Sequence, residues 1–179
     1  GKSKWQTRVG KAFSQQNYTG SRATPTIDGD RLYYETPHGD VACLNANTGK
    51  PIWGLNMREK FDAQGISWAF SESVLVDRDN VIIFPGGRQV GAAALNRKTG
   101  RTVWTCEELG GDKAGYCSPI VVEQGGLRQV VGMTERAAVG IHADTGKLLW
   151  RFEHPTKYGA NIPNPIYHDG HIYICSGYG

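Results

Sequence analysis

One eleven-residue pattern recurs three times in this chain, and each copy ends on a tryptophan that follows a Thr-Gly pair. The copies occupy residues 43–53, 94–104 and 140–150. The closing tryptophans, Trp53, Trp104 and Trp150, are 51 and 46 residues apart. A recurrence of this length is typical of stacked supersecondary units, each of which packs on its neighbours. The chain is therefore an array of repeats.

Both ends of the chain fall inside a repeat. Gly1 and Trp5 have the same four-residue offset as Gly49 and Trp53. At the other end, residues 165–173 resemble residues 25–33, which open the first complete unit. We therefore expect three whole units and two partial ones, cut from a longer polypeptide.

The unit that ends at Trp104 has the pattern of four short strands. Residues 73–76 and 81–84 are β-branched runs on either side of a cluster of turn formers. Residues 92–95 and 102–105 are further apolar runs, separated by a turn that contains the Thr-Gly pair. Helical periodicity appears nowhere at convincing length. The unit is predicted to be a four-stranded antiparallel meander.

Four short strands per unit, with a glycine and an aromatic residue at fixed positions, are typical of a β-propeller blade. We predict an all-β fold, one partial β-propeller domain over residues 1–179. Its expected parts are the last strand of a preceding blade at 1–10, blades at 20–58, 68–106 and 115–153, and the first strands of a further blade at 161–179. The arc should be open, so that the Trp5 strand and the Tyr173 strand do not share a sheet.

The repeated glycines and tryptophans have a structural explanation. Glycine adopts positive φ without the steric cost that a side chain would impose, which suits a turn between the third and fourth strands. The tryptophan then opens the outer strand, where its ring could cover the joint between two blades, and its indole N–H needs a partner when buried. The residues predicted to have these structural roles are Gly49, Trp53, Gly100, Trp104, Gly146 and Trp150.

Composition excludes some classes of function. The net charge is only +3 and the basic residues are scattered, so nucleic acid is not an expected partner. No apolar run is long enough to cross a membrane. The cysteines, Cys43, Cys106, Cys117 and Cys175, are far apart, which argues against a structural zinc site, although one disulfide is possible if the protein is exported.

The repeated pattern A-x-D-x-x-T-G-x-x-x-W resembles the tryptophan-docking motif of pyrroloquinoline-quinone (PQQ) repeats. Propellers with this repeat typically have eight blades, so the resemblance implies that the chain is a fragment of an eight-bladed ring. They include quinoprotein alcohol dehydrogenases and the lipoprotein of the outer-membrane barrel-assembly machinery. The resemblance also implies a location in the periplasm or cell envelope of a bacterium.

Having this repeat does not imply binding the quinone. Enzymes of the family resemble one another in a catalytic aspartate, a calcium or lanthanide ion and, in many, a disulfide between adjacent cysteines. This chain has no adjacent cysteines, and Asp77-Arg78-Asp79-Asn80 lacks the glycine and glutamate of a calcium loop. We therefore predict no catalytic residues, no metal site and no cofactor, with PQQ and calcium as the alternative.

A ligand of a propeller would be expected where the first strand of each blade enters the central channel. The entry segments are residues 21–24, 68–72, 115–118 and 161–164, and they differ more between units than the Thr-Gly pattern does. Their mix of charged, aromatic and amide side chains could hold a small polar molecule or a peptide. The alternative is ordinary strand-end packing. The candidate ligand-binding residues are Arg22, Trp68, Glu72, Tyr116, Asn161 and Asn164.

Three functions remain open at this point. We predict a non-catalytic scaffold of the bacterial envelope that binds a protein partner or a small polar ligand. The first alternative is part of a PQQ-dependent alcohol dehydrogenase. The second is a structural protein without a ligand.

Overall fold

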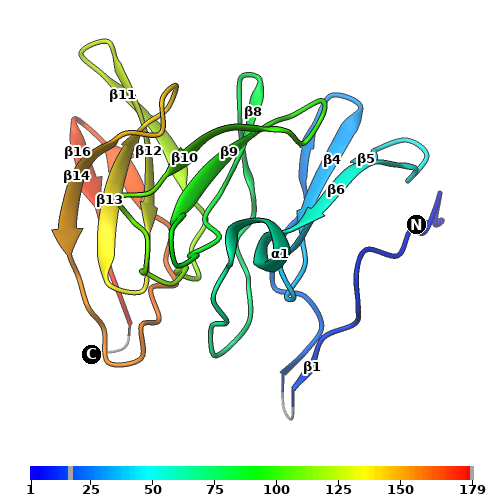
Figure 1. Ribbon diagram of the computed structural model, residues 1–179. Coiled ribbons are helices and arrows are strands. Elements are labelled where there is room, and N and C mark those ends of the chain that lie inside the picture. Colours follow the sequence, from blue (N-terminus) through cyan, green and yellow to red (C-terminus); the bar gives the residue numbers. More distant parts are fainter. Residues whose placement is uncertain (16–17, 178–179) are drawn as a thin grey trace.

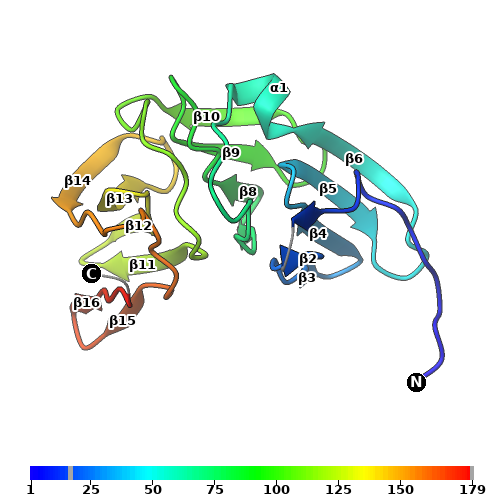
Figure 2. The same ribbon diagram turned by 90° about the horizontal axis from the view of Figure 1, so that it is seen from below.

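The computed structural model describes residues 1–15 and 18–177, and it consists of antiparallel sheets arranged side by side in an open arc (Figures 1 and 2). Three sheets have four strands each, and each is a meander in which neighbours in sequence are neighbours in space. The outer strands β6, β10 and β14 lie along the convex rim of the arc (Figure 2). These sheets have the architecture expected of propeller blades, so the predicted fold class is confirmed.

The strands follow the unit pattern. The first sheet contains β3 (Thr26–Asp28), β4 (Arg31–Glu35), β5 (Asp40–Asn45) and β6 (Pro51–Asn56). The second contains β7 (Leu75–Asp77), β8 (Asn80–Ile83), β9 (Ala92–Asn96) and β10 (Thr102–Cys106). The third contains β11 (Ile120–Gln124), β12 (Leu127–Met133), β13 (Ala137–His142) and β14 (Leu148–Glu153). The two-stranded sheets are β1 (Ser14–Gln15) with β2 (Tyr18–Thr19), and β15 (Ile166–His168) with β16 (His171–Tyr173).

The hydrophobic core lies between neighbouring sheets. In β8, Val81 and Ile83 pack toward the first sheet, whereas Ile82 packs toward the third. The alanines of β9 alternate in the same way. Successive side chains of a strand point to opposite faces, so a sheet that is covered on both sides needs apolar residues at every position. This explains why the strands of the second unit are continuous apolar runs.

Trp5, Trp53 and Trp104 each lie on the Thr-Gly turn of the next unit. A Cβ added to Gly49, Gly100 or Gly146 would lie 2.4 to 2.8 Å from the ring of Trp5, Trp53 or Trp104 respectively. The indole N–H of each of these tryptophans donates to a backbone carbonyl of the same neighbouring turn, at 2.9 to 3.0 Å. The three glycines have φ values of 70°, 69° and 76°, which confirms the expected positive φ.

A β-bulge precedes Trp53, Trp104 and Trp150 in the outer strands. Trp53 pairs with Cys43, but Pro51 pairs with Leu44, so Ile52 is the extra residue of the bulge. The register shifts in the same way in the second and third sheets, where Val103 and Leu149 are the extra residues. Bulges twist a strand locally and re-aim its side chains. The repeated sequence pattern does not indicate these bulges.

The structure differs from expectation at three places. Residues 1–10 contain no strand, although the last strand of a preceding blade was expected there, because no neighbouring strand of the described chain pairs with them. Helix α1 (Met57–Phe61) was not expected; the Asn56 side chain caps it by accepting from the backbone N–H groups of Arg58 and Glu59. The small β1–β2 sheet was not expected either.

The arc is open. The β15–β16 sheet has two strands, and residues 1–10 are not hydrogen-bonded into it. The expectation that the Trp5 segment and Tyr173 do not share a sheet is therefore confirmed. No helix among the described residues is long and apolar enough to cross a membrane.

Candidate ligand-binding site

Hydrogen bonds between the loops that enter successive sheets fix the inner ends of those sheets. The backbone N–H of Thr24 donates to Ser73 Oγ at 2.9 Å, and that of Ser73 donates to Ser118 Oγ at 2.9 Å. The N–H of Ser118 continues the series to Asn164 Oδ1 at 2.7 Å. Each four-stranded sheet is thus joined to the next sheet at its inner end by a side-chain acceptor, and Trp53 and Trp104 join the four-stranded sheets to one another near their outer strands.

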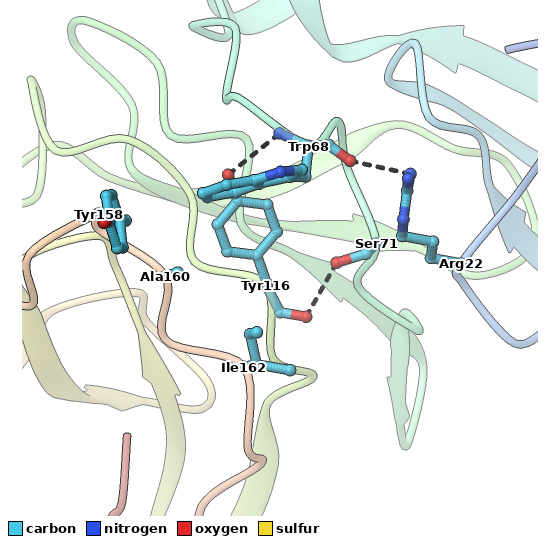
Figure 3. A pocket seen from close by; sticks show the side chains of 7 residues that line it. All are labelled: Arg22, Trp68, Ser71, Tyr116, Tyr158, Ala160 and Ile162. Carbon is cyan, nitrogen blue, oxygen red and sulfur yellow. Dashed lines mark hydrogen bonds between the residues drawn. The ribbon is translucent and has the colours of Figure 1, made fainter. Parts of the chain in front are cut away.

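These loops enclose a cavity of about 590 Å³ (Figure 3). Its volume is in the range of cavities that hold small organic ligands. All of its lining residues belong to segments that lead from one sheet into the first strand of the next. They are Arg22, Trp68, Ser71, Tyr116, Tyr158, Ala160 and Ile162.

Three aromatic rings from three successive loops form the main wall of this cavity. The ring centroids of Trp68 and Tyr116 are 5.7 Å apart, and those of Trp68 and Tyr158 are 6.4 Å apart. Both pairs are edge-to-face, with interplanar angles of 62° and 87°. Edge-to-face packing is a favoured arrangement for aromatic pairs and holds the rings in defined positions.

Backbone hydrogen bonds position the same side chains. The N–H of Trp68 donates to the hydroxyl of Tyr116 at 3.3 Å, and the carbonyl of Trp68 accepts from the guanidinium of Arg22 at 2.9 Å (Figure 3). Ser71 Oγ donates to the carbonyl of Tyr116 at 3.0 Å. Because Tyr116 is half-buried, desolvation raises the pKa of its hydroxyl, which therefore stays protonated at neutral pH.

Positive charge lies near the rim of the cavity. The guanidinium of Arg22 lies over the ring of Phe13, at 5.5 Å from the centroid, and the ammonium of Lys157 lies over Tyr158 at 5.4 Å. Glu135 lies near Tyr116 and forms an ion pair with Arg136 at 3.7 Å. The cavity therefore combines aromatic walls with a cationic edge.

The structure brings Arg22, Trp68 and Tyr116 together, but three other candidate residues do not line this cavity. Asn161 is fully buried: its Nδ2 donates to the carbonyl of Thr134 at 2.8 Å, and its Oδ1 accepts from Ser176 at 2.8 Å. Asn164 joins the third sheet to the next one through Ser118. These amides hydrogen-bond neighbouring loops to one another.

Glu72 is buried beside a second acid rather than directed into the cavity. Glu72 Oε2 accepts from the backbone N–H of Phe84 at 3.2 Å. Burial raises the pKa of Glu72 to about 8, a shift that the Phe84 N–H partly opposes. Burial, and then the charge of Glu72, raise the pKa of Glu35 well above its ordinary value. Within residues 1–15 and 18–177, neither oxygen of Glu35 has a hydrogen-bond partner.

Sequence analysis missed Ser71, Tyr158, Ala160 and Ile162 as lining residues. Ser71 and Ile162 lie inside the entry segments, and the conformation of these irregular loops decides which of their side chains reach the cavity. Tyr158 lies upstream of those segments. Its position after the end of β14 is the signal that could have identified it, because the loop there must return to the inner end of the arc.

The cavity does not have the ligands of a calcium ion. No carboxylate is among its lining residues, and calcium takes six to eight oxygen ligands, usually including carboxylates. No group of three or more metal-ligating side chains occurs elsewhere in the described part of the chain. The four cysteines are free thiols, three of them buried. The donors present around this cavity therefore do not fit a calcium-dependent quinone.

The sequence is similar to those of quinoprotein dehydrogenases. It is 27% identical over 169 residues to the quinoprotein alcohol dehydrogenase PedH of Pseudomonas putida, an alignment that covers 90% of this chain and 26% of the relative. It is 28% identical over 210 residues to the quinoprotein glucose dehydrogenase of Escherichia coli, covering 96% of this chain and 25% of the relative. The chain therefore spans about a quarter of the length of these relatives.

Solved structures share the fold. BamB from Moraxella catarrhalis superposes with a TM-score of 0.60 at 16% identity, covering 90% of this chain and 45% of BamB. The quinohemoprotein alcohol dehydrogenase of Comamonas testosteroni superposes with a TM-score of 0.60 at 17% identity, covering 87% of this chain and 32% of the enzyme. At these identities the likeness shows the fold alone.

A family model described as outer membrane protein assembly factor BamB matches all of residues 1–179. The repeated tryptophan on its neighbour's turn, the four-stranded sheets and the match over the whole chain agree with one another. This chain therefore belongs to the BamB-like family of PQQ-repeat propellers.

Proposed function

We propose that this chain is part of a non-catalytic propeller scaffold of the bacterial envelope, and that its inner-end cavity binds a ligand or a segment of a partner protein. The observation that carries this proposal is the convergence of Trp68, Tyr116 and Tyr158 from three successive loops on one cavity. Clefts with aromatic walls and a few polar groups are the usual form of a binding site.

The joints between the sheets support a binding role. The two joints between the four-stranded sheets are each held at two places, by a tryptophan near the outer strand and by a side-chain hydrogen bond at the inner end, and the joint to the β15–β16 sheet is held at its inner end. Such joints keep the three loops in fixed relative positions, and a preformed site pays little ordering cost on binding. The polar lining groups Ser71 and Tyr116 make hydrogen bonds to backbone groups, so they hold the loops in place.

The proposed kind of partner and the proposed location are inferred from the family to which the chain belongs. The family description is that of an outer membrane protein assembly factor, which favours a protein partner in the bacterial envelope. A small polar ligand is the other kind of occupant that the cavity volume permits.

A second function is favoured by a specific observation. The sequence relatives named above are quinoprotein dehydrogenases, with identities of 27% and 28%. The chain would then supply part of the propeller of a PQQ-dependent dehydrogenase. The lining residues of the cavity include no carboxylate, which favours the scaffold instead.

Two measurements on the protein that contains this chain separate the functions. The first screens small acids, amides, sugars and short peptides for thermal stabilisation of the wild type and of Tyr116→Ala. The second adds PQQ and calcium and follows dye reduction with primary alcohols. The scaffold predicts a ligand that stabilises the wild type more than Tyr116→Ala, with no dye reduction. Dye reduction would establish the dehydrogenase, and a screen without any ligand would contradict the binding role.

A further inference from the structure

Trp68 differs from the other four tryptophans of the chain. Trp5, Trp53 and Trp104 donate their indole N–H to the next unit, and Trp150 donates to Gln129 Oε1 at 2.6 Å. The indole N–H of Trp68 donates to no acceptor within residues 1–15 and 18–177, while its backbone N–H and carbonyl are both hydrogen-bonded. Trp68 is half-buried and lines the cavity. Trp68 Nε1 is not one of the buried polar atoms that lack a partner, so its N–H is open to water or to a ligand.

The backbone next to Trp68 is strained. Ala69 has a φ of 66°, a conformation that residues with a side chain rarely adopt, and it is buried. The turn is closed by the N–H of Ala69, which donates to the carbonyl of Ile66 at 3.1 Å. Strain of this kind persists only where the surroundings enforce it, and it is concentrated at ligand sites. This strained turn directly follows Trp68, whose indole N–H has no acceptor among the described residues.

The surroundings of this indole define the chemistry of an occupant. The rings of Tyr116 and Tyr158, with Ile162, provide apolar contact for a flat or aliphatic group. Arg22 is the charged residue among the lining residues, and Lys157 lies over Tyr158. The acid near Tyr116, Glu135, is paired with Arg136, so the two cations near the rim attract an anion and oppose a cationic ligand. A carboxylate oxygen is an acceptor for an indole N–H and complements this charge.

We propose that the cavity binds a carboxylate attached to an aromatic or branched apolar group, with Trp68 Nε1–H donating to the carboxylate. This assignment rests on the binding role proposed above and names the ligand class for it. A free organic acid and the carboxyl end of a peptide present the same chemistry, so both are sources of the ligand. The apolar group lies against Tyr116 and Tyr158, and Arg22 contributes its positive charge.

The test uses matched acids and amides on the full chain. The probes are 3-phenylpropanoate and its primary amide, and acetyl-Ala-Ala-Phe with a free or an amidated carboxyl end, titrated by calorimetry and tryptophan fluorescence. We expect at least one acid to bind at least tenfold more tightly than its amide, because a hydrogen bond to a charged group and the cationic rim are lost with the charge. Tighter binding of the peptide acid identifies a chain end as the source, and tighter binding of 3-phenylpropanoate identifies a free acid.

Trp68→Phe is the decisive variant, because it keeps an aromatic ring and removes the indole N–H together with the second fused ring; the lost ring area affects acid and amide alike, so the difference between the two probes reports the N–H. We expect it to weaken binding of the acid about tenfold and to leave binding of the amide nearly unchanged. Trp150→Phe is the matched control, since the N–H that it removes already has an acceptor, and it should leave both affinities within twofold. Circular dichroism of each variant shows whether it is folded.

The outcomes separate this inference from the proposed function. Equal binding of acid and amide, or an acid affinity that Trp68→Phe leaves unchanged, overturns the carboxylate assignment while the cavity remains a binding site. Absence of binding by all four probes also overturns the assignment, and the broader screen then decides the binding role independently.

Discussion

The indole N–H of Trp104 donates a 3.0 Å hydrogen bond to the carbonyl of Ala143 in the next unit. The ring of Trp104 also lies against Gly146 and is only 7% exposed. This side chain belongs to the outer strand of the second sheet and covers the joint to the third sheet.

Replacing Trp104 with alanine should destabilise the protein by about 3 to 5 kcal/mol, the range for removing a large buried aromatic side chain. Val103→Ala is the control, because Val103 is in the same strand but 51% exposed, and it should cost less than about 1 kcal/mol. Urea unfolding followed by fluorescence measures both. Equal effects of the two substitutions would show that Trp104 does not hold the joint.

Gly100→Ala should be more costly than an alanine at another glycine with positive φ. The added Cβ would lie 2.8 Å from the Trp53 ring, in addition to the strain at φ 69°. Gly125 has φ 59° but open space around it, so Gly125→Ala measures the backbone cost alone, about 1 kcal/mol. We expect thermal unfolding to show a loss for Gly100→Ala that is larger by about 1 to 3 kcal/mol. A similar loss for both variants would exclude close contact with Trp53.

The sequence predicts these joints because the same residues recur at fixed spacing. Turn formers and apolar runs predicted four strands per unit, and the Thr-Gly pairs predicted positive φ at Gly49, Gly100 and Gly146. The bulges at Ile52 and Val103 were not predictable in this way, because a bulge depends on how two strands pair. The capping role of Asn56 was visible in principle, but helix α1 is too short to show helical periodicity.

The candidate site was predictable only in part. Arg22, Trp68 and Tyr116 occupy entry segments that the repeat alignment identifies. Asn161 and Glu72 occupy such segments too, but they are buried. Whether an entry residue faces the cavity or the joint depends on the conformation of an irregular loop. The positive φ of Ala69 is an example, because nothing in the residue type predicts it.

Ala69→Gly should stabilise the fold, because glycine adopts a φ of 66° without the cost that alanine incurs there. We expect a gain of about 0.5 to 1 kcal/mol in the free energy of unfolding, reduced by the greater entropy of glycine in the unfolded chain. Ala137→Gly, at a buried strand position, should instead destabilise. Differential scanning calorimetry distinguishes the two. Destabilisation by Ala69→Gly would mean that its backbone is not strained.

Glu35 and Glu72 should make stability fall as pH rises. Their pKa values are raised in the folded state, that of Glu72 to about 8, so the folded protein holds protons that the unfolded chain has lost. The stability contributed by the protonated pair is complete below the pKa of the unfolded carboxyls, near 4.5, and is lost as pH rises through the folded pKa values.

Chemical unfolding between pH 5 and 9 checks this dependence. Glu35→Gln removes one titrating group and should flatten the profile, whereas Glu59→Gln, at an exposed position of α1, should leave it unchanged. A wild-type stability that rises over this interval would contradict the buried acid pair.

The central claim is that the tryptophans of the repeat are structural, whereas Trp68 presents its indole N–H to a ligand cavity. Hydrogen exchange of the five indole protons, followed by NMR on tryptophan labelled with ¹⁵N, measures this directly on the folded chain without ligand. We predict that the indole protons of Trp53 and Trp104 exchange slowly, because both are hydrogen-bonded in the joints, and that the proton of Trp68 exchanges fastest among these three. Protection of Trp68 equal to that of Trp104 would contradict the account.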